Sequence, residues 1–249
     1  CPHLSLYSMK GCRKRDYPPT ISPQQPYWSF NKPVEDYMAR TSYLSSVGTY
    51  AAEMLVLVPL ESAYVDYANG TEPGKTGDER FNAFTRTLDT LLAHQRDYDL
   101  GDEEIISEKG MVKDDALQIG DMQYRAVMLP YLRTIRASTI AVLEKFAAEK
   151  GIILAAGALP DLVDGRKNDD MIRRLTAITR VLPENDVAAA LAAAVPPRVN
   201  VVGTNKANVW VSRRLLPGGS MTMFFNRSRL ENADVSVTLC DMENPVLWD

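Results

Sequence analysis

Short apolar runs that alternate with helical patterns constrain the fold of this 249-residue chain more than any other feature of its sequence. Residues 54–60, 124–129 and 152–156 are strand-sized stretches made almost entirely of apolar side chains, and Pro130 stops the second stretch. Strands that are apolar at successive positions suit a parallel sheet that is covered on both faces. Between these runs, apolar residues recur at intervals of three and four, which is the spacing of one helical face.

Strands and helices in this rhythm predict parallel pairing with right-handed crossovers, and therefore a three-layer α/β domain. Helices are expected over residues 81–92, 140–147, 171–178 and 186–195, with a short strand and a short helix within 98–108 and a last strand at 198–202. A polar loop is expected after residue 60. An earlier helix, capped by Asn31 with Pro33 in its first turn, is expected to end at Gly48.

The two ends of the chain have different residue patterns from its middle. Residues 1–30 are irregular, because several prolines there exclude a continuous helix or a central strand. Residues 208–213 and 221–225 alternate in the strand period around a turn at 217–219, and another strand is expected at 235–240. The expected division is therefore 1–50, 51–203 and 204–249. Because both outer parts look incomplete, we expect the chain to be a piece of a longer polypeptide.

Charge and composition exclude some classes of partner. The net charge of −4 provides no basic field for nucleic acid, and the longest apolar stretches fall far short of the ~20 residues that a membrane-spanning helix needs. With His3 and His94 as the only histidines and three scattered cysteines, no metal site is expected in this chain. A disulfide between Cys1 and Cys12 stays open if the protein is exported.

The middle part contains two candidate sites. Residues 69–76 miss the phosphate-loop pattern only because Asn69 replaces its first glycine, and the segment begins too far from its strand, so a nucleotide site is not expected. Ligands of α/β sheets bind where strands end, here near Glu61, Ser62, Pro130, Tyr131 and residues 157–160. No nucleophilic cysteine of the class I glutamine amidotransferases stands there, which favours a structural or assembly role.

Aromatic and basic side chains make the N-terminal segment the candidate site. Aromatic rings with polar tips stack on sugar rings and bind hydroxyl groups. The candidate contacts are His3, Tyr7, Arg13, Tyr27 and Trp28. A loop that packs two domains together would use the same residue types, and that alternative stays open.

Several segments carry a resemblance to a known family. They resemble the end of the catalytic barrel, and the strand that follows it, in glycoside hydrolase family 106, the α-L-rhamnosidase-like enzymes. The segment His3-Leu4-Ser5-Leu6-Tyr7 begins the match, and the closing Leu247-Trp248-Asp249 resembles the family's first β-sandwich segment. The other matching segments are 8–11, 13–15, 18–19, 24–28, 36–40 and 53–60.

The resemblance implies an architecture: the tail of a (β/α)₈ barrel over 1–50, a flavodoxin-like, glutamine-amidotransferase-like α/β domain over 51–203, and the start of a β-sandwich over 204–249. It implies an enzyme that cleaves terminal α-L-rhamnosyl or similar deoxy-sugar linkages in polysaccharide, with both catalytic glutamates upstream of residue 1. The fragment alone is expected to be inactive.

The remaining expectations follow from the same resemblance. Carbohydrate and the other domains of the same polypeptide are the expected partners, and a periplasmic or secreted location is expected. No cofactor is expected in this chain, and calcium stays open for the full-length enzyme. The alternative is a non-catalytic structural, assembly or carbohydrate-binding module.

Overall fold

The computed structural model describes residues 23, 25–68, 79–182, 187–240 and 244–247. The chain forms two compact units, Cys1–Val47 and Gly48–Asp249, and each is described by itself. No helix in the described ranges is both long and apolar enough to cross a membrane.

The first unit contains the helix expected near its end. A short 3₁₀ helix, η1 (Trp28–Phe30), leads into α1 (Asn31–Ser46), and Pro33 lies in the first turn of α1. Phe30 occupies the N-cap, so the prediction that Asn31 caps the helix is wrong. The Asn31 side chain is already inside the helix, where it donates a hydrogen bond to Glu35. None of the sixteen residues of α1 is buried.

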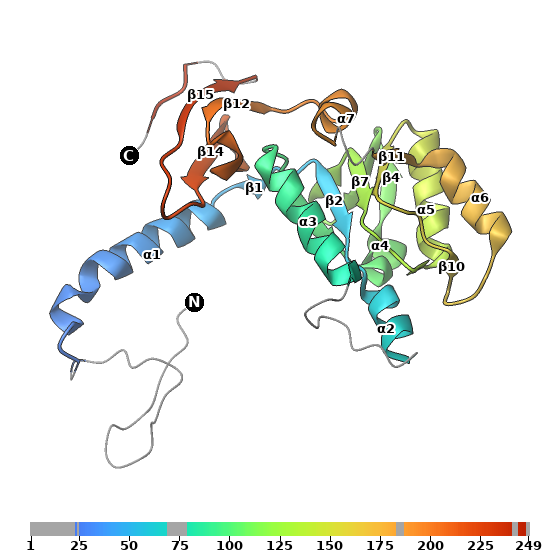
Figure 1. Ribbon diagram of the computed structural model, residues 1–249. Helices are drawn as coiled ribbons and strands as arrows, with labels where there is room; N and C mark the ends of the chain where they lie inside the picture. Colours follow the sequence, from blue (N-terminus) through green and yellow to red (C-terminus); the bar gives the residue numbers. More distant parts are fainter. Residues whose placement is uncertain (1–22, 24, 69–78, 183–186, 241–243, 248–249) are drawn as a thin grey trace, which may run out of the picture. The chain divides into compact units, whose positions relative to one another are not determined.

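A five-stranded parallel sheet forms the middle of the second unit (Figure 1). Its strands are β2 (Met54–Leu57), β3 (Tyr98–Gly101), β7 (Ala126–Leu129), β9 (Ile152–Ala156) and β11 (Arg180–Leu182). They lie in the order β3-β2-β7-β9-β11, and every neighbouring pair is parallel. The apolar runs therefore predicted the three central strands, whose residues are almost all buried.

Alternate residues of the sheet supply two separate cores, so the domain has three layers. On one face Leu55 and Leu57 of β2 join side chains of α4 (Glu103–Lys109), α5 (Ala137–Ala148) and α6 (Asp169–Ile178). On the other face Met54 and Val56 join α3 (Glu79–Ala93) and α7 (Val187–Ala194). These five helices include all those that the apolar spacing predicted within the domain.

Two predictions about the central strands need correction. The first strand ends at Leu57 rather than at residue 60, and a helix, α2 (Leu60–Ala68), replaces the expected polar loop. Pro59 has no N–H for a sheet ladder, and its carbonyl accepts a helical hydrogen bond from the Ala63 N–H instead. The second strand begins at Ala126, because Tyr124 ends β6 (Met122–Tyr124) of a separate antiparallel sheet with β4 (Met111–Lys113) and β5 (Ala116–Ile119).

The strand expected at 198–202 also has a different place from the one predicted. As β12 (Val199–Thr204) it pairs antiparallel with β15 (Asp234–Leu239), so β11 is the strand that completes the parallel sheet. Val199 and Val201 are buried, whereas Asn200 and Val202 are exposed. Alternating burial is typical of an antiparallel sheet with one covered face.

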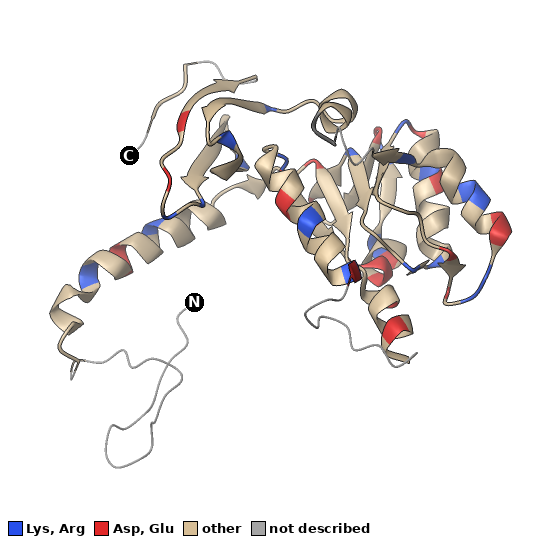
Figure 2. Ribbon diagram, viewed as in Figure 1, with Lys and Arg blue, Asp and Glu red and all other residues tan. Residues whose placement is uncertain are grey.

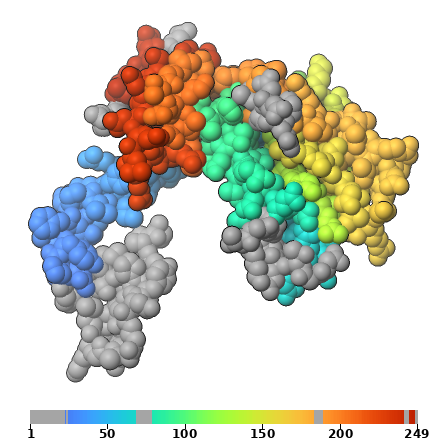
Figure 3. All heavy atoms as spheres, in the orientation of Figure 1, coloured from blue at the N-terminus to red at the C-terminus, as the bar shows by residue number. Residues whose placement is uncertain are grey.

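The C-terminal strands form small antiparallel sheets, as their alternation predicted. In the first, β13 (Val209–Leu216) pairs with β14 (Gly219–Asn226) and with β1 (Thr49–Tyr50). Gly218 makes the turn between β13 and β14 with φ +81°, a conformation that glycine adopts without strain. A small core of Val199, Val201, Val209 and Val211 joins the two sheets. These strands gather beside α3 in the space-filling view (Figure 3).

Polar side chains tie these antiparallel strands to the amino edge of the parallel sheet. The Gln95 side-chain amide donates to the carbonyls of Lys206 (3.2 Å) and Val209 (3.0 Å). Asp97 accepts from the Tyr50 hydroxyl and from the Arg213 N–H, the latter at 3.2 Å. This end of the sheet is therefore a packing surface.

An ion pair reinforces the same edge. Glu53, which precedes β2, accepts from Arg198 Nη2 at 2.8 Å and from Arg198 Nε at 3.1 Å. Arg125 reaches Glu53 only at 3.8 Å, and its side chain is 68% exposed. Of these two arginines, Arg198 makes the closer contact with Glu53. Because Arg198 lies just before β12, this contact links the antiparallel strands to the parallel sheet.

Candidate functional site

Most of the residues predicted to contact sugar lie outside the described part of the chain. His3, Tyr7 and Arg13 are among these, as are both cysteines of the possible disulfide and the loop at 69–76. Tyr27 and Trp28 are described: Tyr27 is the N-cap of η1 and Trp28 is its first residue. Their side chains are 49% and 38% exposed, respectively, so both reach solvent within this unit.

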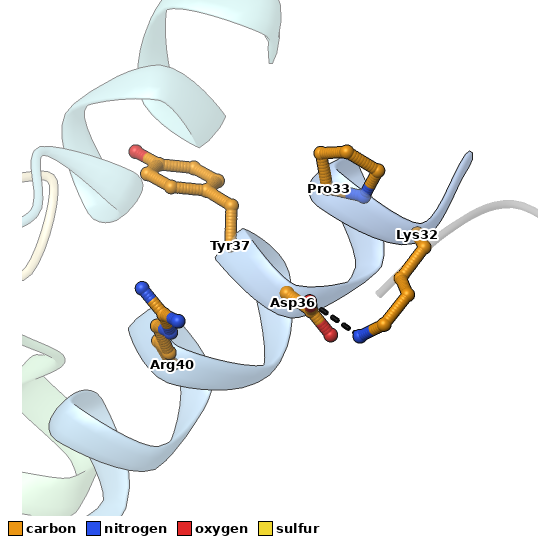
Figure 4. A pocket seen from close by; sticks show the side chains of 5 residues that line it. All are labelled: Lys32, Pro33, Asp36, Tyr37 and Arg40. Carbon is orange, nitrogen blue, oxygen red and sulfur yellow. Dashed lines mark hydrogen bonds and ion pairs between the residues drawn. The ribbon is translucent and has the colours of Figure 1, made fainter. Parts of the chain in front are cut away.

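A surface pocket of about 370 Å³ lies along α1 in the same unit (Figure 4). The Lys32 ammonium and the Asp36 carboxylate form an ion pair of 2.6 Å there. The lining residues are Lys32, Pro33, Asp36, Tyr37 and Arg40. An aromatic ring beside charged groups suits the stacking and hydrogen bonding that sugars need. Tyr37 and Arg40 are three positions apart, which places them on one helical face, so the sequence spacing of α1 indicates their proximity.

The second unit has polar groups where its parallel strands end. After β2, the buried Ser62 hydroxyl accepts the N–H groups of Arg133 (2.9 Å) and Thr134 (3.2 Å), which follow β7. The Arg80 guanidinium lies 5.6 Å from the ring centre of Tyr131. Ser62 and Tyr131, two residues that the strand-end rule named, thus each have a contact within the domain.

A buried carboxylate joins three elements at this carboxyl edge. Asp66 of α2, only 3% exposed, accepts from Arg80 Nε (2.5 Å) and Nη2 (2.8 Å) of α3. Arg133 Nη1 donates to the same carboxylate at 2.9 Å. Because two cations compensate one buried anion, this cluster fixes α2 and α3 at the end of the sheet. Figure 2 shows both signs of charge on the helices around this edge.

Arg136, at the start of α5, organises a second cluster. Its guanidinium bonds Glu61 Oε1 at 2.6 Å and Glu104 Oε2 at 3.3 Å, and the hydrogen bond with Glu61 raises the pKa of Arg136. Its backbone N–H donates to Glu103 Oε2 at 2.8 Å. Glu103 is 4% exposed, and burial raises the pKa of its carboxyl group.

A pocket of about 390 Å³ opens beside Arg136, between α2 and the two short strands β8 (Thr134–Ile135) and β10 (Leu162–Val163). Its lining includes one aromatic ring, two carboxylates and one guanidinium. The lining residues are Glu61, Tyr64, Val65, Ala68, Thr134, Ile135, Arg136, Asp164 and Gly165. Of these, only Glu61 was named by the strand-end rule.

The sequence did not predict the other lining residues, and the local structure explains why. Tyr64 lies one turn after Glu61 on α2, a segment expected as loop. Arg136 and Asp164 follow β8 and β10, and two-residue strands leave no readable pattern.

Glu61 and Glu103 do not form a hydrolytic pair. Glycoside hydrolysis needs two carboxyl groups on either side of the scissile bond. Glu103 is buried and bound to a backbone N–H, and it does not line the pocket beside Glu61, so the two do not flank a common ligand. Among the described residues there is no group of three or more His, Cys, Asp or Glu side chains that could hold a metal ion.

Two solved structures share the fold of this chain. The rhamnosidase from Novosphingobium sp. PP1Y aligns with a TM-score of 0.60 and 17% identity, over 88% of this chain and 21% of that one. The apo exo-carrageenase GH42 from Bacteroides ovatus aligns with a TM-score of 0.52 and 16% identity, over 85% of this chain and 27% of that one. This chain therefore spans less than a third of either protein.

These likenesses show a mixed α/β fold, with a parallel sheet and antiparallel strands, like that found within glycoside hydrolases. No protein-family model matches the sequence, and no curated relative matches it.

Proposed function

We propose that this chain is part of a glycoside hydrolase that cleaves terminal α-L-rhamnosyl, or similar deoxy-sugar, linkages in polysaccharide. The observation that carries the proposal is the fold alignment over 88% of this chain with only 21% of a rhamnosidase. The segments at the N-terminus that resemble glycoside hydrolase family 106 support the same assignment.

The proposed architecture keeps the three parts expected from the sequence: a barrel tail over 1–50, an amidotransferase-like α/β domain over 51–203 and the start of a β-sandwich over 204–249. In chain order the five parallel strands lie 2-1-3-4-5, which is the order of a flavodoxin-like sheet and supports the middle assignment. The antiparallel ladder of β13 with β14, which lies within 204–249, supports the last one.

In this proposal the acid and the base or nucleophile are carboxyl groups upstream of residue 1. This chain contributes substrate contacts, with Tyr27 and Trp28 stacking on a sugar ring and His3, Tyr7 and Arg13 bonding its hydroxyl groups. The described residues offer no cluster of three or more side chains that could bind calcium. A periplasmic or secreted location, and contact with the other domains of the polypeptide, belong to the same proposal.

The decisive experiment compares this chain with the longer polypeptide that contains it. We expect the longer protein to release p-nitrophenol from p-nitrophenyl α-L-rhamnopyranoside and the 249-residue chain to release none. The β-D-galactopyranoside serves as the control substrate. Release by the chain alone would contradict the placement of the catalytic groups. If the longer protein cleaves neither glycoside, the alternative of a non-catalytic structural or carbohydrate-binding module is favoured.

The role of Trp28 is tested in the same longer protein. Trp28→Ala removes a stacking surface, so we expect KM for the rhamnoside to rise about tenfold, with a smaller change in kcat. Phe30→Ala is the matched control, because Phe30 is an aromatic residue of the same 3₁₀ helix and is 74% exposed. Equal effects of the two substitutions would show that Trp28 has no specific contact.

A further inference from the structure

The pocket beside Arg136 lies at the topological switch point of the parallel sheet. The connection that leaves β2 leads to α3 on one face, whereas the connection that leaves β7 leads to α5 on the other. Adjacent strands whose connections diverge leave a crevice at their carboxyl ends, and ligands of open α/β sheets bind there. Glu61 follows β2 and Arg136 follows β7, so the pocket is built from both sides of this crevice.

The start of α5 is already supplied with negative charge by the protein. The Ala137 N–H donates to Asp164 Oδ1 at 3.2 Å, and the Arg136 N–H donates to Glu103 Oε2 at 2.8 Å. A phosphate at a helix N-terminus would need such N–H groups for itself. Two carboxylates in their place would also repel it, so this pocket disfavours an anion.

The groups that remain available suit a neutral ligand rich in hydroxyl groups. Glu61 and Asp164 carry carboxylate lone pairs that accept from hydroxyl groups, and the Arg136 guanidinium donates to them. The Tyr64 side chain lines the pocket and is 60% exposed, so its ring is accessible for stacking. The volume of about 390 Å³ is within the range of small-molecule sites.

We propose that this pocket of the α/β domain is a binding site for a neutral saccharide. One sugar ring lies against Tyr64, with its hydroxyl groups bonded to Glu61, Arg136 and Asp164. The lining of the site includes none of the residues 3–28 proposed as sugar contacts, and no bond is made or broken in it. The proposal of this binding site can therefore be tested separately from the proposed hydrolysis.

Calorimetric titration of the 249-residue chain tests the proposal directly. The probes are L-rhamnose, D-galactose and D-glucose. Each is used up to about 20 mM, well above the Kd of about 1 mM that we expect for a single ring in an open site. Inorganic phosphate at the same concentration is the anionic probe. We expect at least one sugar to bind and phosphate not to bind.

Two tyrosines of α2 provide matched variants that locate the binding. Tyr64→Ala is expected to weaken sugar binding about tenfold. Tyr67→Ala is the control, because Tyr67 is 69% exposed on the same helix and does not line the pocket. Glu61→Gln keeps the shape of the side chain and removes its charge, so it should also weaken binding. Phe30→Ala, in the N-terminal unit, should leave the affinity of this site unchanged.

Three results would overturn the proposal. They are the absence of binding by all three sugars, binding of phosphate in their place, and equal loss of affinity in the Tyr64 and Tyr67 variants. Circular dichroism of each variant, with a signal equal to that of the parent, ensures that a loss of affinity is not a loss of fold.

Discussion

The two edges of the parallel sheet differ in what their polar groups contact. At the amino edge, Gln95, Asp97 and Glu53 reach the antiparallel strands and the segment before them, so their hydrogen bonds join two parts of the chain. At the carboxyl edge, Asp66 and Arg136 bind other groups of the α/β domain itself. A pocket lies beside Arg136 at the carboxyl edge.

The difference shows how one sheet separates packing from binding. Side chains at the amino edge are committed to another sheet, so a ligand there would compete with folding. Side chains at the carboxyl edge form ion pairs within the domain, among them Glu61 with Arg136, and these two residues line an open pocket together with Tyr64. Each edge can be disturbed separately, so the comparison can be tested.

The largest expected effect comes from the anchor of the carboxyl edge. Asp66→Ala leaves the Arg80 and Arg133 guanidinium groups without their shared counter-ion, and we expect the free energy of unfolding to fall by about 3 kcal/mol. Urea denaturation measures it. The control is Asp89→Ala, which breaks an exposed pair with Arg227 (3.4 Å) and should lower stability by less than about 0.5 kcal/mol. Equal losses would mean that Asp66 does not anchor this edge.

The next effect is at the amino edge. Gln95→Ala removes the donor that the carbonyls of Lys206 and Val209 share, and we expect a loss of about 1.5 kcal/mol. Gln118→Ala is the matched control, since its amide bonds only the nearby Gly120 carbonyl in an exposed turn. Denaturation in urea should separate the two variants. A loss no greater than that of the Gln118 variant would show that Gln95 does not join the two parts.

A smaller effect separates two arginines that approach one carboxylate. Arg198→Ala should cost about 1 kcal/mol, because its bonds to Glu53 are close and bidentate. Arg125→Ala should cost about 0.2 kcal/mol or less, because its side chain is exposed and 3.8 Å away. Thermal unfolding of both variants measures the difference. The reverse order would contradict the assignment of Arg198 as the link to β12.

The finest test uses pH. Burial raises the pKa of Asp97 in the folded chain above its value of about 3.9 in the unfolded chain. The folded state therefore binds the proton more readily, so the stability from this group is present below the unfolded pKa and is lost as pH rises through the folded pKa. Asp97→Asn removes the titrating carboxyl group, so the variant does not lose stability through this group as pH rises. We expect the stability of the variant, relative to the parent, to increase from pH 4 to pH 8 in urea titrations. Glu103→Gln should change the same way, because burial also raises the pKa of Glu103. Parallel curves for parent and variant would contradict this.

The sequence predicted the elements with strong apolar patterns and missed those without one. Residues 152–156 are a buried strand as expected, because five successive apolar residues suit a covered parallel strand. The helix Leu60–Ala68 was missed, since Tyr64 and Tyr67 face solvent and break the apolar spacing. The strand Arg180–Leu182 has three residues, too few to show a period.

The error at residues 198–202 has another cause. Valine-rich segments suit parallel and antiparallel strands alike, and the partner of Val199 is Leu239, far along the chain. The candidate site was predictable only in outline. Strand ends indicated the carboxyl edge through Glu61, but Arg136 and Asp164 reach the pocket only through the pairing of β8 with β10.

The pairing of β12 with β15 has a consequence for how the chain is made. All five parallel strands have been synthesised once translation has passed Leu182, whereas Val199 can pair with Leu239 only after the chain has grown to that residue. Because domains fold as units during synthesis, we expect the parallel sheet to form first. Gln95 and Asp97 at its amino edge are then available for hydrogen bonds with the antiparallel strands that emerge later. Ribosome-bound chains stalled shortly after the sheet has emerged should already protect α5 from proteases.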